Sequence, residues 1–140
     1  MQSKSRLMVV LAGFALVVTV GLSAALVASQ DQSTNQAVVA GRKAFLENCA
    51  ACHGLDARGG GHVASTIKSV PMDLSQIAAR HKEFSRYDVQ QTILGEPTQN
   101  DPVARDMPHW GHVFRQEGGD ALAMLQTHNL VSYLESIQER

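Results

Sequence analysis

Two cysteines and a histidine lie within one short segment, Cys49-Ala50-Ala51-Cys52-His53. The chain of 140 residues holds no other cysteine, so this C-x-x-C pair accounts for every thiol. Alone, the pair fits a disulfide, a thiol-disulfide exchange site or half of a four-ligand zinc site. The histidine that follows favours covalent attachment of a c-type haem, because two intervening residues let both sulfurs reach the vinyl groups on one edge of the ring. We therefore expect thioether bonds at Cys49 and Cys52, with His53 as the proximal iron ligand.

The sixth iron ligand is expected from a loop that contains one methionine. Met107 lies in the sequence D-M-P-H-W-G, and its thioether is soft and neutral, so a Met/His pair raises the reduction potential as suits an electron carrier. The competing interpretation is that Met107 only fills a gap in the core. Bis-histidine ligation is the main alternative, and the rival ligands are Met72, Met124, His62, His81, His109, His112 and His128.

Three further side chains near these candidate ligands each have two open roles. Trp110 offers an indole N–H that either donates to a haem propionate or bonds to backbone while the ring packs beside the haem. Arg58 and Arg105 either neutralise the propionates or stay solvated at the surface. Both roles stay open for each residue.

The elements that must position these residues all have helical patterns. Apolar residues at helical spacing predict a helix over residues 37–50, which leads into the cysteines. Asp73 and Ser85 are suitable N-caps for two middle helices. Glycines and prolines interrupt residues 95–109, and a last helix is expected over residues 120–137. Because no alternating strand pattern occurs, we expect an all-α domain of about four or five helices wrapped around one covalently attached haem.

The N-terminal segment, residues 1–28, is an export signal. Lys4 and Arg6 precede an uncharged run over residues 7–28. Its 22 residues exceed the roughly 7–15 of a signal-peptide core and match the about 20 that span a bilayer. We therefore expect either a cleaved signal peptide or an uncleaved membrane anchor. The positive charges before the run direct the rest of the chain to the periplasmic side.

Two segments follow this leader. Residues 29–36 are polar and lack an apolar face, so they are expected to form a flexible spacer. Residues 37–140 are expected to form the domain, with one haem because no internal repeat or second C-x-x-C-H occurs. The expected location is the periplasm, either soluble after cleavage or tethered to the inner membrane by residues 7–28.

The charge balance limits the class of partner. The chain carries 12 Lys and Arg residues against 13 Asp and Glu residues, and two of the basic residues lie in the leader. The exported part is therefore mildly acidic. This balance argues against a nucleic-acid partner, because nucleic acid requires a basic face.

From Gly41 to Ile137 the chain resembles the class I, single-haem bacterial cytochrome c family. Gly41 and Phe45 are similar to the small residue and the aromatic residue of that family's first helix. Tyr133 is similar to the aromatic residue of its last helix. The resemblance implies that these two helices cross closely, which explains a glycine inside a helix.

Two further segments carry the resemblance, and one position departs from it. Residues 71–75 look like the family's P-x-D-L-T segment, and residues 107–111 look like its M-P-x-W-G ligand loop, which implies that Met107 is the distal ligand. Related sequences often have a proline where this chain has His62, in a loop whose backbone carbonyl accepts the N–H of the proximal imidazole. The acceptor of that hydrogen bond is therefore left unassigned, together with the reduction potential that it tunes.

Together these features predict a single-haem c-type cytochrome that transfers single electrons and is not an enzyme. Many members of the similar family serve terminal oxidases, photosynthetic centres or periplasmic dehydrogenases. The expected partners are thus a redox donor and acceptor, such as a membrane oxidase, reductase or dehydrogenase, with the membrane itself added if the leader is retained. Two alternatives stay open: a haem subunit of a larger membrane redox complex, and a haem enzyme or gas sensor with a labile distal ligand.

Overall fold

The structure is a computed structural model that describes residues 31–95 and 107–139. The chain divides into two compact units, residues 1–35 and 36–140. The predicted leader, residues 1–28, lies outside the described residues. Within the described part of the chain, no helix combines the length and the apolar character needed to cross a membrane.

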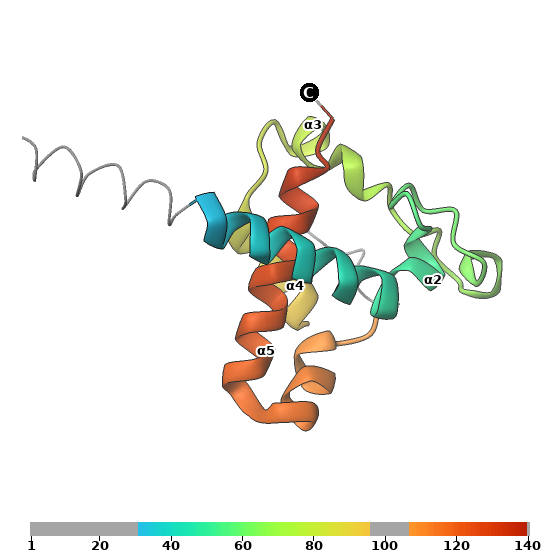
Figure 1. Ribbon diagram of the computed structural model, residues 1–140. Coiled ribbons are helices and arrows are strands. Elements are labelled where there is room, and N and C mark those ends of the chain that lie inside the picture. Colours follow the sequence, from blue (N-terminus) through green and yellow to red (C-terminus); the bar gives the residue numbers. More distant parts are fainter. Residues whose placement is uncertain (1–30, 96–106, 140) are drawn as a thin grey trace, which may run out of the picture. The chain divides into compact units, whose positions relative to one another are not determined.

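Helices make up the larger unit (Figure 1). Residues 36–48 are helical and lead into the cysteine motif. The later elements, in chain order, are α2 (Ala50–His53), the 3-10 helices η1 (Ala64–Thr66) and η2 (Leu74–Gln76), then α3 (Ile77–His81), α4 (Arg86–Leu94) and α5 (Trp110–Ser136). The residues that the structure describes form no strand. The predicted all-α fold is confirmed.

Two predicted helix starts are confirmed by their caps. Asp73 Oδ1 accepts a hydrogen bond from the Ser75 backbone N–H at 2.9 Å, directly before η2 and α3. The Ser85 hydroxyl accepts from the Asp88 N–H at 3.3 Å, at the start of α4. At the other end of α4, Gly95 adopts a positive φ of 81°. These caps satisfy or redirect backbone groups that the first and last helical turns leave unpaired.

Two segments are helical where the sequence predicts no helix. Residues 31–36 are helical, although their composition predicts a flexible spacer over residues 29–36. Polar side chains lower helix propensity only slightly, so they do not forbid a helix. Residues 110–117 are also helical, because α5 begins ahead of the predicted last helix. Inside α5, directly before the predicted last helix, Gly118 and Gly119 have non-helical dihedral angles and form a kink.

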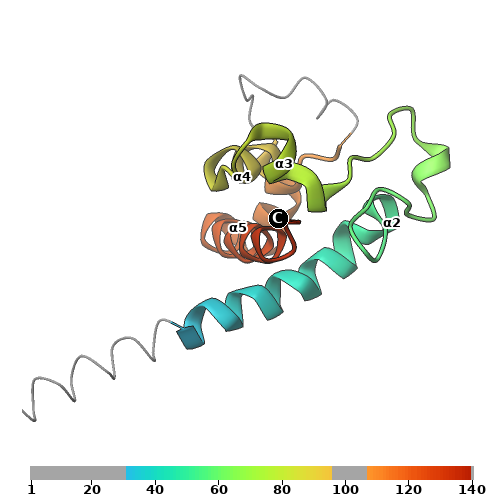
Figure 2. The ribbon, with the colours of Figure 1, turned by 90° about the horizontal axis from the view of Figure 1, so that it is seen from above.

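Helix 36–48 crosses α5 at very short range (Figure 2). A Cβ atom added at Gly41 would lie 1.9 Å from the Asn129 carbonyl oxygen and 2.9 Å from the Tyr133 Cβ. Phe45, one turn later, is fully buried, and its ring centroid lies 5.3 Å from that of Tyr133. The close crossing that the resemblance implies is therefore confirmed, and glycine is required there because any side chain would collide with α5.

The pairing of α4 with α5 completes the core. A Cβ atom added at Gly111 would lie 2.6 Å from the Leu94 carbonyl oxygen, so the end of α4 packs directly on the start of α5. Further along, the Arg86 guanidinium donates to the Ser132 hydroxyl at 3.0 Å and pairs with Glu135. These contacts fix α4 and α5 as two walls of the site described next.

Candidate functional site

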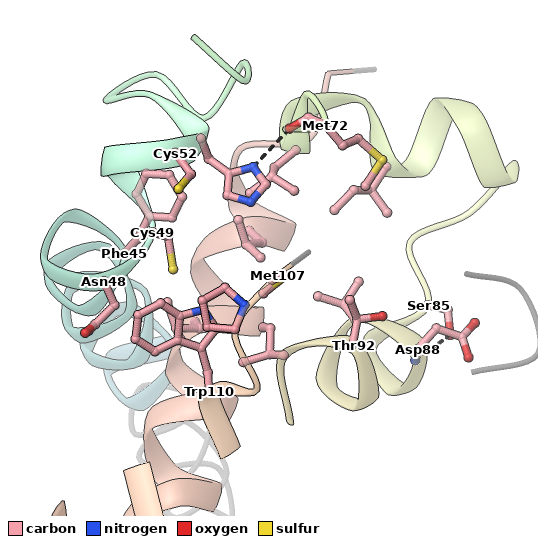
Figure 3. Close-up of a pocket in the computed structure, with 18 of the residues that line it drawn as sticks. Phe45, Asn48, Cys49, Cys52, Met72, Ser85, Asp88, Thr92, Met107 and Trp110 are labelled. Carbon is pink, nitrogen blue, oxygen red and sulfur yellow. Dashed lines mark hydrogen bonds between the residues drawn. The ribbon is translucent and has the colours of Figure 1, made fainter. Parts of the chain in front are cut away.

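A cavity of about 1060 Å³, including the space open to solvent, lies among these helices (Figure 3). Ser85, Asp88 and Thr92 contribute polar groups from the region of α4. The rest of the wall is mainly apolar and includes Phe45, Leu74, Ile77, Val89, Ile93, Leu130 and Leu134. An apolar site with a few polar groups is suited to a large, mostly apolar ligand.

Helix geometry brings both cysteines and the histidine to this cavity. The Cys49 N–H donates to the Phe45 carbonyl at 2.8 Å, and the His53 N–H donates to the Cys49 carbonyl at 2.9 Å. Helical hydrogen bonding therefore continues from helix 36–48 into α2, and side chains three and four residues apart share one face. Cys49, Cys52 and His53 all line the cavity, and the two thiols form no disulfide.

The surroundings of the thiols argue against the redox and zinc alternatives. Burial, with a smaller electrostatic effect from Cys52, raises the pKa of Cys49 from 9.0 to about 12. A thiol-disulfide exchange site needs a thiolate and hence a lowered pKa. Among the described residues, no group of three or more His, Cys, Asp or Glu side chains is arranged to hold a metal ion. Zinc would lack its four ligands there.

The His53 imidazole is held by a backbone carbonyl. Its Nδ1 lies 3.1 Å from the Met72 carbonyl oxygen (dashed line in Figure 3). Because a carbonyl only accepts, Nδ1 carries the proton and Nε2 keeps its lone pair. Burial lowers the pKa of His53, although the bond to Met72 acts in the opposite sense, so the ring is neutral at neutral pH. A neutral, oriented imidazole of this kind is a good metal ligand.

This hydrogen bond supplies the acceptor that the sequence left unassigned. His62, at the position where related sequences often have proline, is exposed and does not line the cavity. The carbonyl comes instead from Met72, within the segment that looks like P-x-D-L-T. Sequence reasoning missed this role because a backbone carbonyl is present in every residue, and only the adjacent family-like segment offered a signal.

The loop after the motif positions the Met72 carbonyl. The Gly59 N–H donates to the His53 carbonyl at 2.7 Å, and the Leu74 N–H donates to the Ala57 carbonyl at 2.8 Å. Gly59 has a positive φ of 90°, and a Cβ atom there would lie 2.3 Å from the Pro71 carbonyl oxygen. The glycine thus allows the loop to lie directly against the segment that supports the imidazole.

Met107 reaches the same cavity from the irregular segment before α5. Met107, Pro108 and Trp110 all line the cavity (Figure 3). The Trp110 ring stacks on Phe114 with centroids 5.8 Å apart and planes at 27°. This stacking anchors the start of α5 beside Met107. The structure therefore brings together the four residues that the sequence singles out, namely Cys49, Cys52, His53 and Met107.

The rival ligands are less well placed. Met72 lines the cavity but belongs to the segment that already supports His53, and His81 lines it from the exposed end of α3. Met124 is 50% exposed and lies outside the cavity lining. The remaining histidines are exposed and also lie outside the lining: His62, His109, His112 and His128.

The candidate propionate partners differ in position. Arg58 forms an ion pair with Glu139 and does not line the cavity. Arg105 lies outside the described residues. Trp110 does line the cavity, so of the two described candidates it is the one placed where a bound group would lie.

The donor set and the wall of the cavity fit a c-type haem. Two unpaired thiols stand three residues apart, a neutral imidazole follows, a methionine lines the same space, and the wall is mainly apolar. Soft sulfur and imidazole nitrogen are suitable haem-iron ligands. The residues present therefore match the group that the motif predicts.

Comparison with known proteins agrees with this assignment. The family model described as Cytochrome c matches residues 38–138, which is most of the chain. No curated protein and no solved structure shows a significant match. Because the match covers more than half of the chain and includes every residue that lines the cavity, the chain belongs to the cytochrome c family.

Proposed function

We propose that this protein is a class I, single-haem c-type cytochrome that transfers single electrons between redox partners on the periplasmic side of the membrane. The cytochrome c family consists generally of haem-based electron carriers. The observation that supports a single haem with a Met/His ligand pair is that Cys49, Cys52, His53 and Met107 all line one largely apolar cavity.

Each of the four residues has a distinct role in this proposal. Cys49 and Cys52 would hold the haem covalently, since each free thiol can add across one vinyl C=C bond, forming an S–C bond while its hydrogen goes to the other vinyl carbon. His53 Nε2 is the proximal ligand, because Nδ1 is engaged with the Met72 carbonyl. Met107 is the distal ligand. When bound, the haem supplies the Fe(III)/Fe(II) couple that accepts and releases one electron.

The chain's own residues then favour electron transfer over catalysis. His53 and Met107 would both hold the iron, so that a peroxide or a diatomic gas would find no free ligand position. Both ligands are neutral, and the apolar wall around Leu130 and Leu134 keeps water away from the bound group. A Met/His pair raises the reduction potential, as an electron carrier requires.

The distal ligand is the feature that an experiment tests first. Purified holoprotein should give the weak far-red ferric band of methionine–iron coordination, and carbon monoxide should leave the ferrous spectrum unchanged. Met107→Ala should abolish the band and admit carbon monoxide. Met124→Ala is the matched control, because Met124 lies outside the cavity lining, and it should keep the band. High-spin wild-type protein would favour an enzyme or sensor, whereas a band that survives Met107→Ala would mean that another methionine, such as Met72, is the distal ligand.

The periplasmic location and the partners form a separate part of the proposal. It is supported by the leader over residues 1–28, with its basic start and uncharged run. The partners are a redox donor and acceptor of the kind found in membrane oxidases, reductases and dehydrogenases. Mass measurement of protein from membrane and periplasmic fractions tells whether the leader is retained. Copurification with a membrane enzyme in mild detergent would support a role as a fixed subunit.

A further inference from the structure

The last residues of the chain bind the segment that follows the His53 acceptor. Gln138 lies just beyond α5, and its Nε2 donates to the Leu74 carbonyl at 2.8 Å and to the Leu134 carbonyl at 2.7 Å. Its Oε1 accepts from the Ala78 backbone N–H at 2.9 Å. One side chain therefore joins the end of α5 to both η2 and α3.

The neighbouring Glu139 strengthens the same connection. Its backbone N–H donates to the Ser75 carbonyl at 3.0 Å. Its carboxylate accepts a hydrogen bond from Gln76 and forms an ion pair with Arg58, which lies in the loop after the haem motif. We call Gln138 and Glu139 together the C-terminal latch. The latch thus contacts two segments: the loop after the haem motif, and the segment that follows the Met72 carbonyl, which is the acceptor for His53.

The latch binds Leu74, which lies two residues after the acceptor Met72 along the chain. Leu74 is fixed at both of its backbone groups, because its N–H donates to Ala57 and its carbonyl accepts from Gln138. Met72, two residues earlier, supplies the carbonyl at 3.1 Å from His53 Nδ1. Displacing Leu74 therefore displaces the end of the short segment that carries the acceptor.

We propose that Gln138 is a positioning residue for the proximal ligand: by holding Leu74, it keeps the Met72 carbonyl at His53 Nδ1 and thereby sets the reduction potential. This inference rests on the proposed function, since it takes His53 as the proximal ligand. Donation from Nδ1–H makes the imidazole a more basic ligand, which stabilises the oxidised iron. Loosening the latch weakens that donation and raises the potential.

Two variants with one matched control test this role in the holoprotein. Gln138→Met keeps the length of the side chain and removes its three hydrogen bonds, and Gln138→Ala also removes the volume. Both should shift the potential upward by a two- to tenfold change in the one-electron equilibrium, which is at most about 59 mV. Gln126→Ala is the same chemical change on α5, at a residue whose amide contacts Glu117 at 3.5 Å, and should leave the potential unchanged.

A second readout separates positioning from general stability. In ferrous protein, hydrogen exchange at His53 Nδ1–H should be faster in both Gln138 variants than in wild type and in Gln126→Ala. If the variants are less stable but keep the wild-type potential and the wild-type exchange at Nδ1–H, Gln138 is purely structural and the proposal is overturned. If wild-type protein carries no covalent haem, or lacks the Met107-dependent band, the proposed function itself is overturned instead.

Wild-type protein provides a test that does not depend on a variant that folds. The Ala78 N–H, bound to Gln138, and the His53 Nδ1–H should exchange through the same opening, with the same dependence on denaturant. If the Ala78 N–H opens independently while the His53 Nδ1–H stays protected, the latch does not hold the acceptor and the proposal fails.

Discussion

The two sides of the cavity are built from different interactions. On the His53 side, a hydrogen-bonded frame supports the imidazole: the Met72 carbonyl accepts from it, and Leu74 beyond is bonded to Ala57 and Gln138. On the Met107 side, the described contacts are packing contacts. Trp110 stacks on Phe114, and Gly111 lies against the carbonyl of Leu94.

The difference follows from the chemistry of the two ligands. An imidazole has a second nitrogen whose N–H must be oriented, so directional hydrogen bonds around it tune its basicity. A thioether has no N–H and its sulfur is only a weak acceptor, so packing mainly determines where the sulfur lies. We therefore expect the His53 side to control the reduction potential, and the Met107 side to be where iron coordination breaks first.

The largest expected effect comes from removing the His53 imidazole. His53→Ala should abolish the low-spin ferrous spectrum of the holoprotein, because His81, the other histidine that lines the cavity, lies at the exposed end of α3. His62→Ala is the control, since His62 is exposed and does not line the cavity, and it should keep the wild-type spectrum. Retention of a low-spin spectrum in His53→Ala would show that another residue is the proximal ligand.

The next effect comes from disturbing the frame without touching a ligand. Gly59→Ala places a Cβ atom 2.3 Å from the Pro71 carbonyl oxygen at a residue with a φ of 90°. We expect a loss of about 1–3 kcal/mol in the free energy of unfolding, measured by denaturant titration, together with a shift in potential. Gly60→Ala is the control, because a Cβ atom there has no neighbour within 4 Å. A stable Gly59→Ala protein with unchanged potential would contradict the frame.

A smaller effect is expected on the packed side. Gly111→Ala places a Cβ atom 2.6 Å from the Leu94 carbonyl oxygen, with no positive φ to add strain. The start of α5 should move away from α4 and weaken the Met107 bond, so the methionine–iron band should disappear at a lower pH than in wild type. The exposed neighbour His112 provides the control variant His112→Ala. If Gly111→Ala changes the potential while the pH dependence of the band is unaffected, the division between the two sides is wrong.

The smallest effect concerns the charge on Asp73. The pKa of this carboxyl is lowered mainly by the Ser75 hydroxyl, with further help from the Ser75 N–H and the charges of Arg58 and Arg80, against an opposing effect of burial. At pH values above the ordinary pKa of 3.8, the ionised carboxylate therefore stabilises the fold. This contribution is lost as the pH falls through the lowered pKa.

Asp73→Asn isolates that charge, because asparagine is also a good N-cap. The free energy of unfolding should be slightly lower than in wild type at neutral pH, and the difference should disappear in acid. Denaturant titrations at several pH values measure this. A difference that persists unchanged into strong acid would mean that the cap, and not the charge, is responsible.

Much of the fold was predictable because its signals are local. Asp73, Ser85 and Gly95 mark helix ends by side-chain or backbone chemistry that acts within a few residues, and the structure confirms each. The grouping of Cys49 with His53 follows from helical spacing. Met107 was singled out by its chemistry and its neighbours, and the structure does place it in the same cavity.

The parts that sequence missed depend on contacts between distant segments. The residue type of Met72 does not indicate that its backbone carbonyl accepts from His53. In the sequence Gln138 is an ordinary polar residue near the chain end, and only the fold places it beside Leu74 and Ala78. The helix over residues 110–117 was hidden by the breakers on both sides of it. Its packing against α4 at Gly111, which no local rule predicts, stabilises it.

The crossing at Gly41 makes the formation of the cavity depend on the last helix of the chain. Its contacts are with Asn129 and Tyr133, and the cavity wall includes Leu130, so the enclosure forms only after the last helix has packed in place. In the folded chain, burial raises the pKa of Cys49 from 9.0 to about 12, so its thiol is less readily ionised there than in an unfolded segment. We therefore expect haem attachment at both thiols to be easiest on an incompletely folded chain, before the C-terminal helix packs against helix 36–48.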